Sequence, residues 1–285
     1  MTASSFAKDS PARRPPTWGV VASVVVLAAI SFIVLLPFLW MVSAAFRPEG
    51  DIIAHPTTLF TGAFTIQHFV DIWVRIPFAQ QLWNTVVFAG GITLLTLVFD
   101  SMAAYALARF EFPGREAIFI VVVATMMLPF QVTLVPLFKL LNEFGWINTY
   151  QGLIVPRATS AFGIFFLRQF MLTIPRELED AARVDGASEF RIWWQVILPL
   201  TAPALLTIGL FNMLANWNDL LWPLIFTTDA SMQTVSAGLA LFKGQHVTEY
   251  GLLMAGSLVA LLPMIVAFLA IQRRFVESIA TTGLK

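Results

Sequence analysis

The sequence predicts an all-α integral membrane protein with six transmembrane helices, and three observations support this prediction. Apolar residues make up 58% of the 285 residues and charged residues only 12%, a balance that no water-soluble domain of this length needs. Six apolar stretches each supply the roughly 20 helical residues that cross a bilayer core of about 30 Å. Basic residues gather in alternate connections between these stretches. We therefore expect one membrane domain embedded in a lipid bilayer.

The predicted domain is divided simply along the chain. Residues 1–16 form a polar tail, residues 17–272 the membrane domain and residues 273–285 a second tail. The six spans are centred on residues 18–42, 84–108, 117–138, 151–171, 200–226 and 251–271. The first apolar run is too long for the core of a cleaved signal peptide, so we expect it to be retained. The long connection at residues 47–82 is expected to hold short helices at the membrane surface.

The short connections predict the orientation, because lysine and arginine accumulate on the cytoplasmic side of a membrane. Twelve of the seventeen basic residues fall in the two tails and in the connections after the second and fourth spans. The opposite connections carry Arg47, Arg75, Lys139 and Lys243, offset by acidic residues. Both termini are therefore expected in the cytoplasm.

The residue inventory argues against several kinds of chemistry. The chain has no cysteine, so it can form no disulfide, thiolate nucleophile or thiolate metal site. It contains no Gly-x-x-x-x-Gly-Lys-Ser/Thr phosphate loop, and its three histidines, His55, His68 and His246, form no His-Glu-x-x-His motif. We expect a non-catalytic protein that holds no cofactor or metal itself and binds no nucleic acid.

The connection at residues 172–197 predicts a helix, a turn and a second helix. Pro175 suits the first turn of a helix, and the acidic residues that follow favour a helix N-terminus. Gly186 is expected to end this helix, and Ala181 and Ala182 leave a shallow surface that another protein's backbone can approach closely. Ser188 can cap the next helix.

The second helix carries an apolar stripe. Phe190, Trp193, Trp194 and Ile197 follow the i, i+3, i+4, i+7 spacing. Such a stripe alone also fits a helix that lies on a membrane surface. We interpret the whole connection as a docking surface for a soluble partner, held against the cytoplasmic face.

One spacing within this connection is specific. Asp180-Ala181-Ala182, Gly186, Val196 and Leu198-Pro199 resemble the signature of the permease subunits of bacterial ATP-binding-cassette importers, which is Glu-Ala-Ala, three residues, Gly, nine residues, Ile, one residue and Leu-Pro. Aspartate replaces glutamate and valine replaces isoleucine. Further segments are similar to the maltose-transporter type of carbohydrate permease: Ala103–Ala106, Phe112–Gly114, Met127–Pro129, Ser160–Gly163, Leu167–Phe170, Trp217–Asp219 and Leu221–Pro223.

The resemblance implies a type I importer permease fold in a bacterial plasma (inner) membrane. It also implies a second homologous permease subunit, a dimer of a cytoplasmic ATPase that binds ATP and magnesium, an extracytoplasmic solute-binding protein and a sugar substrate. Contact with the ATPase would be made through a coupling helix. The residues implied in this coupling are Glu179, Asp180, Ala181, Ala182, Asp185, Gly186, Ala187, Leu198 and Pro199.

The candidate substrate or pore residues are polar or aromatic side chains within the spans: Gln131, Arg157, Ser160, Asn216, Trp217, Asn218 and Asp219. For the group around Trp217 we favour another interpretation, an interfacial aromatic belt with hydrogen bonds between helices. Arg157 could bind a phosphate or carboxylate of the substrate, pair with Asp219 or extend toward the membrane surface. Asp100 could form a gating ion pair or a polar contact within the bundle.

Two alternatives stay open at this point. An ion-coupled secondary transporter would place an ion site at broken helices, usually between inverted repeats, and no such repeat is visible. An importer of glycerol phosphate-type substrates would belong to the same class of transporter, and only Arg157 supports it. A requirement for a separate ATPase distinguishes an importer from a secondary transporter.

Overall fold

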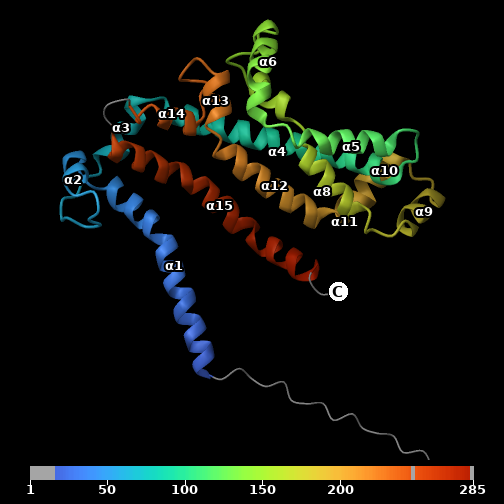
Figure 1. The fold of residues 1–285 in the computed structure, drawn as a ribbon, viewed down its shortest axis with the longest axis horizontal. Helices are drawn as coiled ribbons and strands as arrows, with labels where there is room; N and C mark the ends of the chain where they lie inside the picture. Colours follow the sequence, from blue (N-terminus) through green and yellow to red (C-terminus); the bar gives the residue numbers. More distant parts are fainter. Residues whose placement is uncertain (1–16, 245–247, 283–285) are drawn as a thin grey trace, which may run out of the picture.

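The computed structural model describes residues 17–244 and 248–282, and within these ranges the chain is helical, without a strand beyond one isolated bridge between Lys243 and Thr248. The longer helices are α1 (Thr17–Ala45), α4 (Phe78–Arg109), α5 (Arg115–Thr125), α6 (Phe130–Glu143), α8 (Ala161–Met171), α12 (Ala202–Trp217) and α15 (Tyr250–Thr282) (Figure 1). The predicted all-α class is confirmed. The predicted tail 1–16, His246 and residues 283–285 lie outside the described residues.

The centre of the molecule is α4, which packs against α8 and α12 and also contacts α5 and α14 (Val235–Ala240). Its buried face changes character along the helix. Phe88 and Ile92 are buried near one end, and Ala104 and Ala108 are buried near the other. Alanines have little bulk beyond the backbone, so a neighbouring helix can pack closely there. The helix thus contributes to separate core clusters along the molecule, and it connects them through its own length.

Among the described residues, three helices are long and apolar enough to cross a membrane by themselves: Trp18–Ala45, Phe78–Arg109 and Tyr250–Ala270. Two bent pairs pass the same test jointly, α5 with α6 at 97° and Glu189–Leu200 with α12 at 79°. The predicted spans at 18–42, 84–108 and 251–271 are therefore continuous, whereas those at 117–138 and 200–226 are interrupted. Pro129 precedes α6 at the first bend, where a proline removes a backbone donor.

The predicted span at 151–171 is broken into three pieces. Helix α7 (Tyr150–Ile154) is followed by the 3₁₀ turn η1 (Val155–Arg157) and then by α8. Pro156 lies inside the 3₁₀ turn, and α8 has only 11 residues. A helix can begin at this depth only if its first N–H groups find partners, and the side chains that provide them are described below.

The helix–turn–helix predicted at residues 172–197 is present. Helix α9 (Glu177–Val184) is followed by α10 (Glu189–Ile192), the π-helical segment η2 (Trp193–Ile197) and α11 (Leu198–Leu200). Gly186 takes a left-handed φ of 78° between α9 and α10, and the Ser188 side chain caps α10 by accepting from the Arg191 N–H. We call this end of the molecule the α9 end.

Two details of that prediction were wrong. The N-cap of α9 is Arg176, so Pro175 lies before the helix and not in its first turn. The expected apolar stripe is also divided, because Trp193 and Ile197 are buried while Phe190 and Trp194 are exposed. A π-helix bonds residues i and i+5, so the spacing of an α-helical face does not continue through η2.

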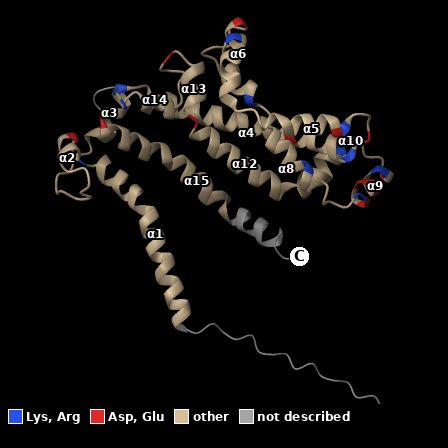
Figure 2. Ribbon diagram, viewed as in Figure 1, with Lys and Arg blue, Asp and Glu red and all other residues tan. Residues whose placement is uncertain are grey.

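The opposite end, which we call the α2 end, contains the short helices predicted within residues 47–82. These are α2 (Glu49–Ala54) and α3 (Gln67–Arg75), and both contact α15 (Figure 1). The Glu49 carboxylate accepts from the backbone N–H groups of Tyr250 and Gly251, each at 2.8 Å. It thereby satisfies the first N–H groups of α15. Figure 2 shows that charged residues concentrate at the two ends and at the tip of α6.

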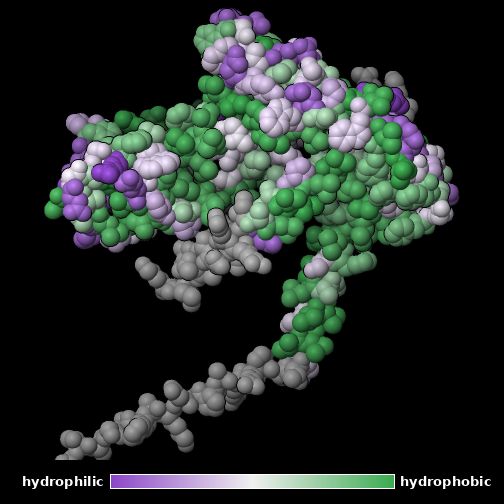
Figure 3. Space-filling view, turned by 180° about the vertical axis from the view of Figure 1, so that it is seen from behind, coloured by the Kyte–Doolittle hydropathy of each residue, from purple (hydrophilic) through white to green (hydrophobic). Residues whose placement is uncertain are grey.

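Helix α1 is almost uncovered by the rest of the chain. It packs on α15 and diverges from the bundle toward its own N-terminus (Figure 1). No residue of its most apolar 18-residue window is buried. Figure 3 shows hydrophobic surface along α1 and over much of the body. Lipid or another membrane protein must therefore cover this surface.

Candidate functional site

The exposed side of α9 forms the first candidate site, which we call the α9 surface. Asp180, Ala181, Asp185 and Gly186 are exposed there. Two apolar side chains accompany them, since Leu178 is 46% exposed and Val184 is 88% exposed. An exposed apolar patch with acidic neighbours is typical of a surface that binds another protein. Four exposed members of the predicted coupling group thus lie on α9 or directly after its last residue.

Other members of the predicted coupling group face inward. Ala182, Ala187 and Leu198 pack against a core cluster that contains Leu167, Ile192 and Trp193. Pro199 is exposed beyond the π-helical segment. These residues support the α9 surface from beneath, and their small or apolar side chains explain why the helix can sit close to the bundle.

Glu179 lies on the inward side of α9 and forms a buried ion pair. Its carboxylate Oε1 lies 2.6 Å from Nε of Arg109, and the two side chains are only 1% and 3% exposed. Arg109 is the last residue of α4, and its Nη2 also donates to the Ile174 carbonyl at 2.8 Å. Burial raises the pKa of the Glu179 carboxyl, and the charges of Arg109 and Arg183 oppose this effect. The pair fastens α9 to α4.

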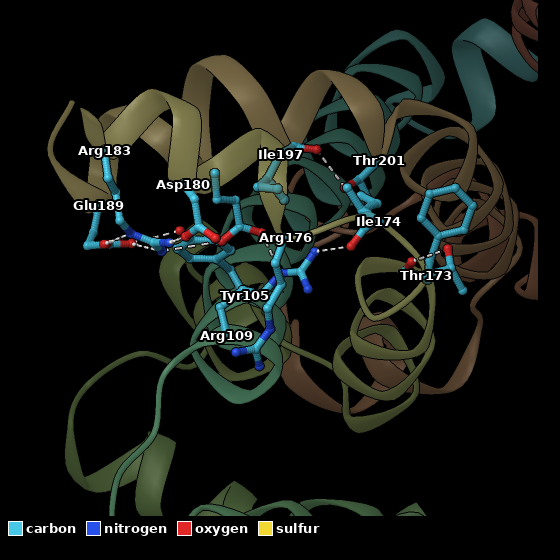
Figure 4. A network of polar contacts seen from close by, with 12 residues as sticks. Tyr105, Arg109, Thr173, Ile174, Arg176, Asp180, Arg183, Glu189, Ile197 and Thr201 are labelled. Atoms are coloured by element: carbon cyan, nitrogen blue, oxygen red, sulfur yellow. Dashed lines mark hydrogen bonds and ion pairs between the residues drawn. The ribbon is translucent and has the colours of Figure 1, made fainter. Parts of the chain in front are cut away.

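Arg183 forms a second link, from α9 to α10 (Figure 4). It donates to Asp180 at 2.8 Å and through Nε to Glu189 at 2.8 Å, while its Nη2 lies 3.4 Å from Glu179. Glu189 also accepts from the Tyr105 hydroxyl of α4 at 2.9 Å. Three helices are therefore joined by charged hydrogen bonds, and the α9 surface is held in one orientation relative to α4.

The second candidate site is a cavity of about 360 Å³, which we call the Arg157 cavity. It lies where α4, α6 and α12 meet the break in the predicted fourth span. Its lining residues are Ile92, Phe130, Thr133, Leu137, Pro156, Arg157, Thr159, Ser160, Asn212, Asn216 and Trp222. Apolar walls with a few converging polar groups are typical of small-molecule sites.

Arg157 forms an ion pair with Asp219, which is one of the three outcomes considered from the sequence. Its guanidinium also lies over the ring of Trp222, at 5.4 Å from the centroid, and 5.9 Å from that of Phe88. The backbone N–H of Trp222 donates to the other Asp219 oxygen at 3.1 Å. Aromatic faces attract a cation. Asp219 therefore balances the charge of Arg157, and the two rings help to hold its guanidinium in place.

Asp100 holds the broken span in place. Its side chain is fully buried and accepts from the Thr159 hydroxyl at 2.6 Å, the Ser160 N–H at 3.0 Å and the Ser160 hydroxyl at 3.1 Å. The Ser160 hydroxyl in turn accepts from the Gly163 N–H and caps α8. A Cβ at position 163 would collide with the Asp100 carboxylate. Asp100 is thus the partner that lets a helix begin inside the bundle.

Asn216 provides a free acceptor at the cavity. The residue is 3% exposed, and its amide donates to the Asn212 carbonyl and side-chain oxygens at 2.8 and 2.7 Å. Within the described residues, its own Oδ1 has no hydrogen-bond partner. A buried acceptor left unpaired is costly, so a hydroxyl or amide donor from a bound molecule would be favoured there.

The remaining candidate pore residues lie elsewhere. Trp217 and Asn218 line a different cavity of about 400 Å³ between α1, α12, α14 and α15, and the Trp217 indole donates to the Ala260 carbonyl. Successive helical residues point about 100° apart, which is why neighbours on one motif face different cavities. Gln131 is exposed at the start of α6 and lines neither cavity.

Sequence reasoning missed five polar or aromatic lining residues: Phe130, Thr133, Thr159, Asn212 and Trp222. One signal was available, because Asn212 and Asn216 are four residues apart on α12 and therefore share a face. Thr133 and Thr159 reach the cavity only because α6 bends away and the fourth span breaks. Those features depend on tertiary packing.

Comparison with known proteins gives a consistent result. Residues 100–281 match the family described as "Binding-protein-dependent transport system inner membrane component". The arabinooligosaccharides transport system permease protein AraQ of Halalkalibacterium halodurans is 34% identical over 90% of this chain and 94% of its own length. The sn-glycerol-3-phosphate transport system permease protein UgpE of Escherichia coli O1:K1 is 33% identical over 87% of this chain and 91% of its own.

The fold also matches a solved structure. A chain of a bacterial ABC transporter involved in the import of the acidic polysaccharide alginate superimposes with a TM-score of 0.80, at 20% sequence identity. The match covers 93% of this chain and all of that chain. At this level of identity the likeness concerns the arrangement of the helices.

Proposed function

Because the chain belongs to the family of inner membrane components of binding-protein-dependent transport systems, we propose that it is half of the pore of an importer that carries a sugar and is driven by a separate ATPase. The membership confirms the resemblance predicted from the spacing of Asp180 to Pro199. The arabinooligosaccharide permease named above supports a sugar as the substrate. The other half of the pore would be a second, homologous permease.

The observation that carries the proposal is the α9 surface. It combines exposed apolar side chains, Leu178 and Val184, with the exposed acid Asp180, and it is fastened rigidly to α4. A dimeric cytoplasmic ATPase, which would bind ATP and magnesium, would dock there. ATP-driven closure of that dimer would then move α9.

A movement of α9 can be transmitted to the Arg157 cavity through α4. The Arg109–Glu179 pair joins α9 to the last residue of α4, and Ile92 of the same helix lines the Arg157 cavity. A displacement of α9 would therefore tilt α4 and change the opening of the cavity. Coupling of this kind needs two packed states that the ATPase binds with different affinity.

The α9 end would face the cytoplasm and the α2 end the opposite side of the bacterial inner membrane. The distribution of basic residues supports this orientation. An extracytoplasmic solute-binding protein would then deliver sugar to the α2 end. The substrate would pass the Arg157 cavity, where hydroxyl and amide groups suit sugar hydroxyls and Phe130 offers an apolar face.

A matched pair of substitutions tests this assignment. Val184 on α9 and Val74 on α3 are 88% and 83% exposed, so arginine at either position is accommodated without disturbing the core. We expect Val184→Arg to abolish co-purification of the ATPase and ATP-dependent uptake, because a charge would enter the docking surface. Val74→Arg should leave ATPase co-purification unchanged.

The measurement is mass spectrometry of the tagged chain extracted from its native membrane in mild detergent, followed by uptake assays. Recovery of a second permease and an ATPase with the parent chain, and loss of the ATPase with Val184→Arg, would support the proposal. Equal ATPase recovery with both variants would contradict the docking surface. Transport by the chain without any ATPase would favour an ion-coupled secondary transporter instead.

A further inference from the structure

We propose that the Arg157 cavity takes an uncharged, polyhydroxylated part of the substrate, and that Asp219 is the specificity-determining residue that excludes anionic substrates. This inference rests on the proposed function, since it assigns a substrate class to the same pore. It addresses the alternative that Arg157 first raised, a substrate with a phosphate or carboxylate.

The cavity holds a cation whose charge is already balanced. Arg157 is the only charged residue among those that line the cavity, and its guanidinium is paired with Asp219. The two side chains are 28% and 17% exposed, so water screens the pair only partly. An anionic substrate would have to displace Asp219, which would leave that carboxylate without its partner in a poorly solvated position.

The hydrogen-bonding groups of the cavity suit hydroxyls. Thr133, Thr159 and Ser160 line the cavity. Their hydroxyls already donate to the Phe130 carbonyl and to Asp100, so toward a ligand these oxygens act as acceptors, which a sugar hydroxyl can satisfy as a donor. Asn216 adds a buried acceptor that has no partner within the described residues. A carboxylate or phosphate oxygen accepts only, so it cannot satisfy Asn216, whereas a sugar hydroxyl can donate to it.

The apolar part of the wall fits the same class of ligand. Phe130 is 38% exposed, and its ring lies 5.5 Å from that of Trp222. Aromatic rings pack against the C–H faces of sugars while the hydroxyls around the rim bind polar groups. The volume of about 360 Å³ falls within the roughly 300–1,000 Å³ that is usual for small-molecule sites.

The chain offers a clean way to measure the charge of the cavity, because it has no cysteine. Thr133→Cys places one thiol in the cavity wall, and Ser236→Cys places one in the separate cavity lined by Trp217 and Asn218. The assembled transporter is reconstituted in liposomes. The labelling rates of an anionic methanethiosulfonate and of a neutral one of similar size are then compared at each cysteine.

In the parent transporter, we expect Thr133→Cys to react with both reagents without a strong preference. Asp219→Asn leaves the Arg157 charge unbalanced, so the anionic-to-neutral ratio should rise about tenfold. The double variant Arg157→Gln/Asp219→Asn should restore the parent ratio, which also shows that the cavity is still formed. The ratio at Ser236→Cys should not change with any of these substitutions.

Sugar protection tests the substrate class in the same preparation. Maltotriose should slow the labelling of Thr133→Cys in the parent, and trigalacturonate should not. In the Asp219→Asn variant, trigalacturonate should become protective. Protection of the parent by trigalacturonate, or by neither sugar, would overturn the inference, and so would a cysteine that neither reagent reaches.

Failure of this inference is distinguishable from failure of the proposed function. Labelling rates report the cavity alone, whereas co-purification of the ATPase and ATP-dependent uptake report the importer. If the chain belonged to an importer with an anion-selective cavity, ATPase co-purification and ATP-dependent uptake would remain as proposed. The labelling and protection results would be reversed.

Discussion

Glu179 and its neighbour Asp180 differ sharply in environment although both are acidic residues of one helix. The Glu179 side chain is 1% exposed and paired with Arg109, whereas the Asp180 side chain is 66% exposed. Burying a charge is costly, so a buried pair stabilises only while both partners are present. At the scale of single residues, the buried Glu179 joins α9 to α4, whereas the exposed Asp180 is available to contact a partner.

The contrast leads to a prediction. Glu179→Gln should destabilise the transporter by about 3–5 kcal/mol, because Arg109 would remain buried without its counter-charge. Asp180→Asn should change stability by less than about 0.5 kcal/mol, since exposed ion pairs contribute little. Thermal unfolding of the purified complex measures both effects. Adding Arg109→Gln to Glu179→Gln should recover part of the loss, and a purely additive double variant would argue against a direct pair.

Elements of this fold are ended or broken at specific residues. Gly186 between α9 and α10 has a φ of 78°, and Gly62 at the α2 end has a φ of 86°. A Cβ at either position would meet nothing within 4 Å. Substitution at these sites therefore acts through backbone conformation alone, which makes the two glycines a matched pair at opposite ends of the molecule.

At this scale, Gly186→Val should cost about 1–2 kcal/mol, because a branched side chain opposes the left-handed conformation. The change would loosen the α9 surface and reduce the stimulation of ATP hydrolysis by substrate. Gly186→Asn should retain more of this stimulation, since asparagine tolerates the same φ better. Gly62→Val has the same conformational cost but lies at the opposite end of the molecule from α9. Substrate should therefore still stimulate ATP hydrolysis in this variant. Equal uncoupling by Gly62→Val and Gly186→Val would refute this account.

Across the whole molecule, charged groups lie mainly at the two ends and apolar surface covers much of what lies between (Figures 2 and 3). Helix α1 extends this apolar surface away from the body while meeting α15 near the α2 end. Phe38 and Met41 of α1 line one cavity together with Leu261 and Met264 of α15. Among the residues that the structure describes, none buries the most apolar window of α1.

This arrangement predicts where α1 can be cross-linked within one chain. The pair Met41→Cys and Leu261→Cys should be joined by a short bifunctional thiol reagent, because both positions line the same cavity. The pair Val24→Cys and Leu261→Cys should not, since Val24 lies in the exposed part of α1. The cross-link is scored as a mobility shift in denaturing gels. Efficient joining of the second pair would mean that α1 folds back along the bundle.

The sequence predicts which segments are helical better than it predicts whether each membrane span is one unbroken helix. Apolar runs of sufficient length predict α1, α4 and α15, because length and hydropathy are local properties. Pro129 and Pro156 mark breaks in other spans, yet the angle of 97° between α5 and α6 depends on packing that no local pattern contains. The fourth predicted span is broken where Asp100, about 60 residues earlier in the chain, accepts from the N–H of Ser160, the residue that caps α8.

The same limit applies to the candidate sites. The coupling residues share one short segment, so their spacing could be recognised directly. Arg157 and Asp219 are 62 positions apart, and their pairing was only one of three outcomes that the sequence allowed. Whether Asn216 or Trp217 faces the Arg157 cavity depends on the rotation of α12, which the apolar composition of that helix leaves undetermined.

The capping of α15 by Glu49 joins residues 201 positions apart and has a consequence for biogenesis. The helix against which α1 packs, α15, leaves the ribosome after all of the other described helices up to α14. When α1 enters the membrane, α15 has therefore not yet been synthesised. The backbone N–H groups that donate to Glu49 are not yet present either. Closure of the α2 end therefore has to follow the synthesis of α15, and until then α1 depends on lipid or on another protein to cover its apolar surface.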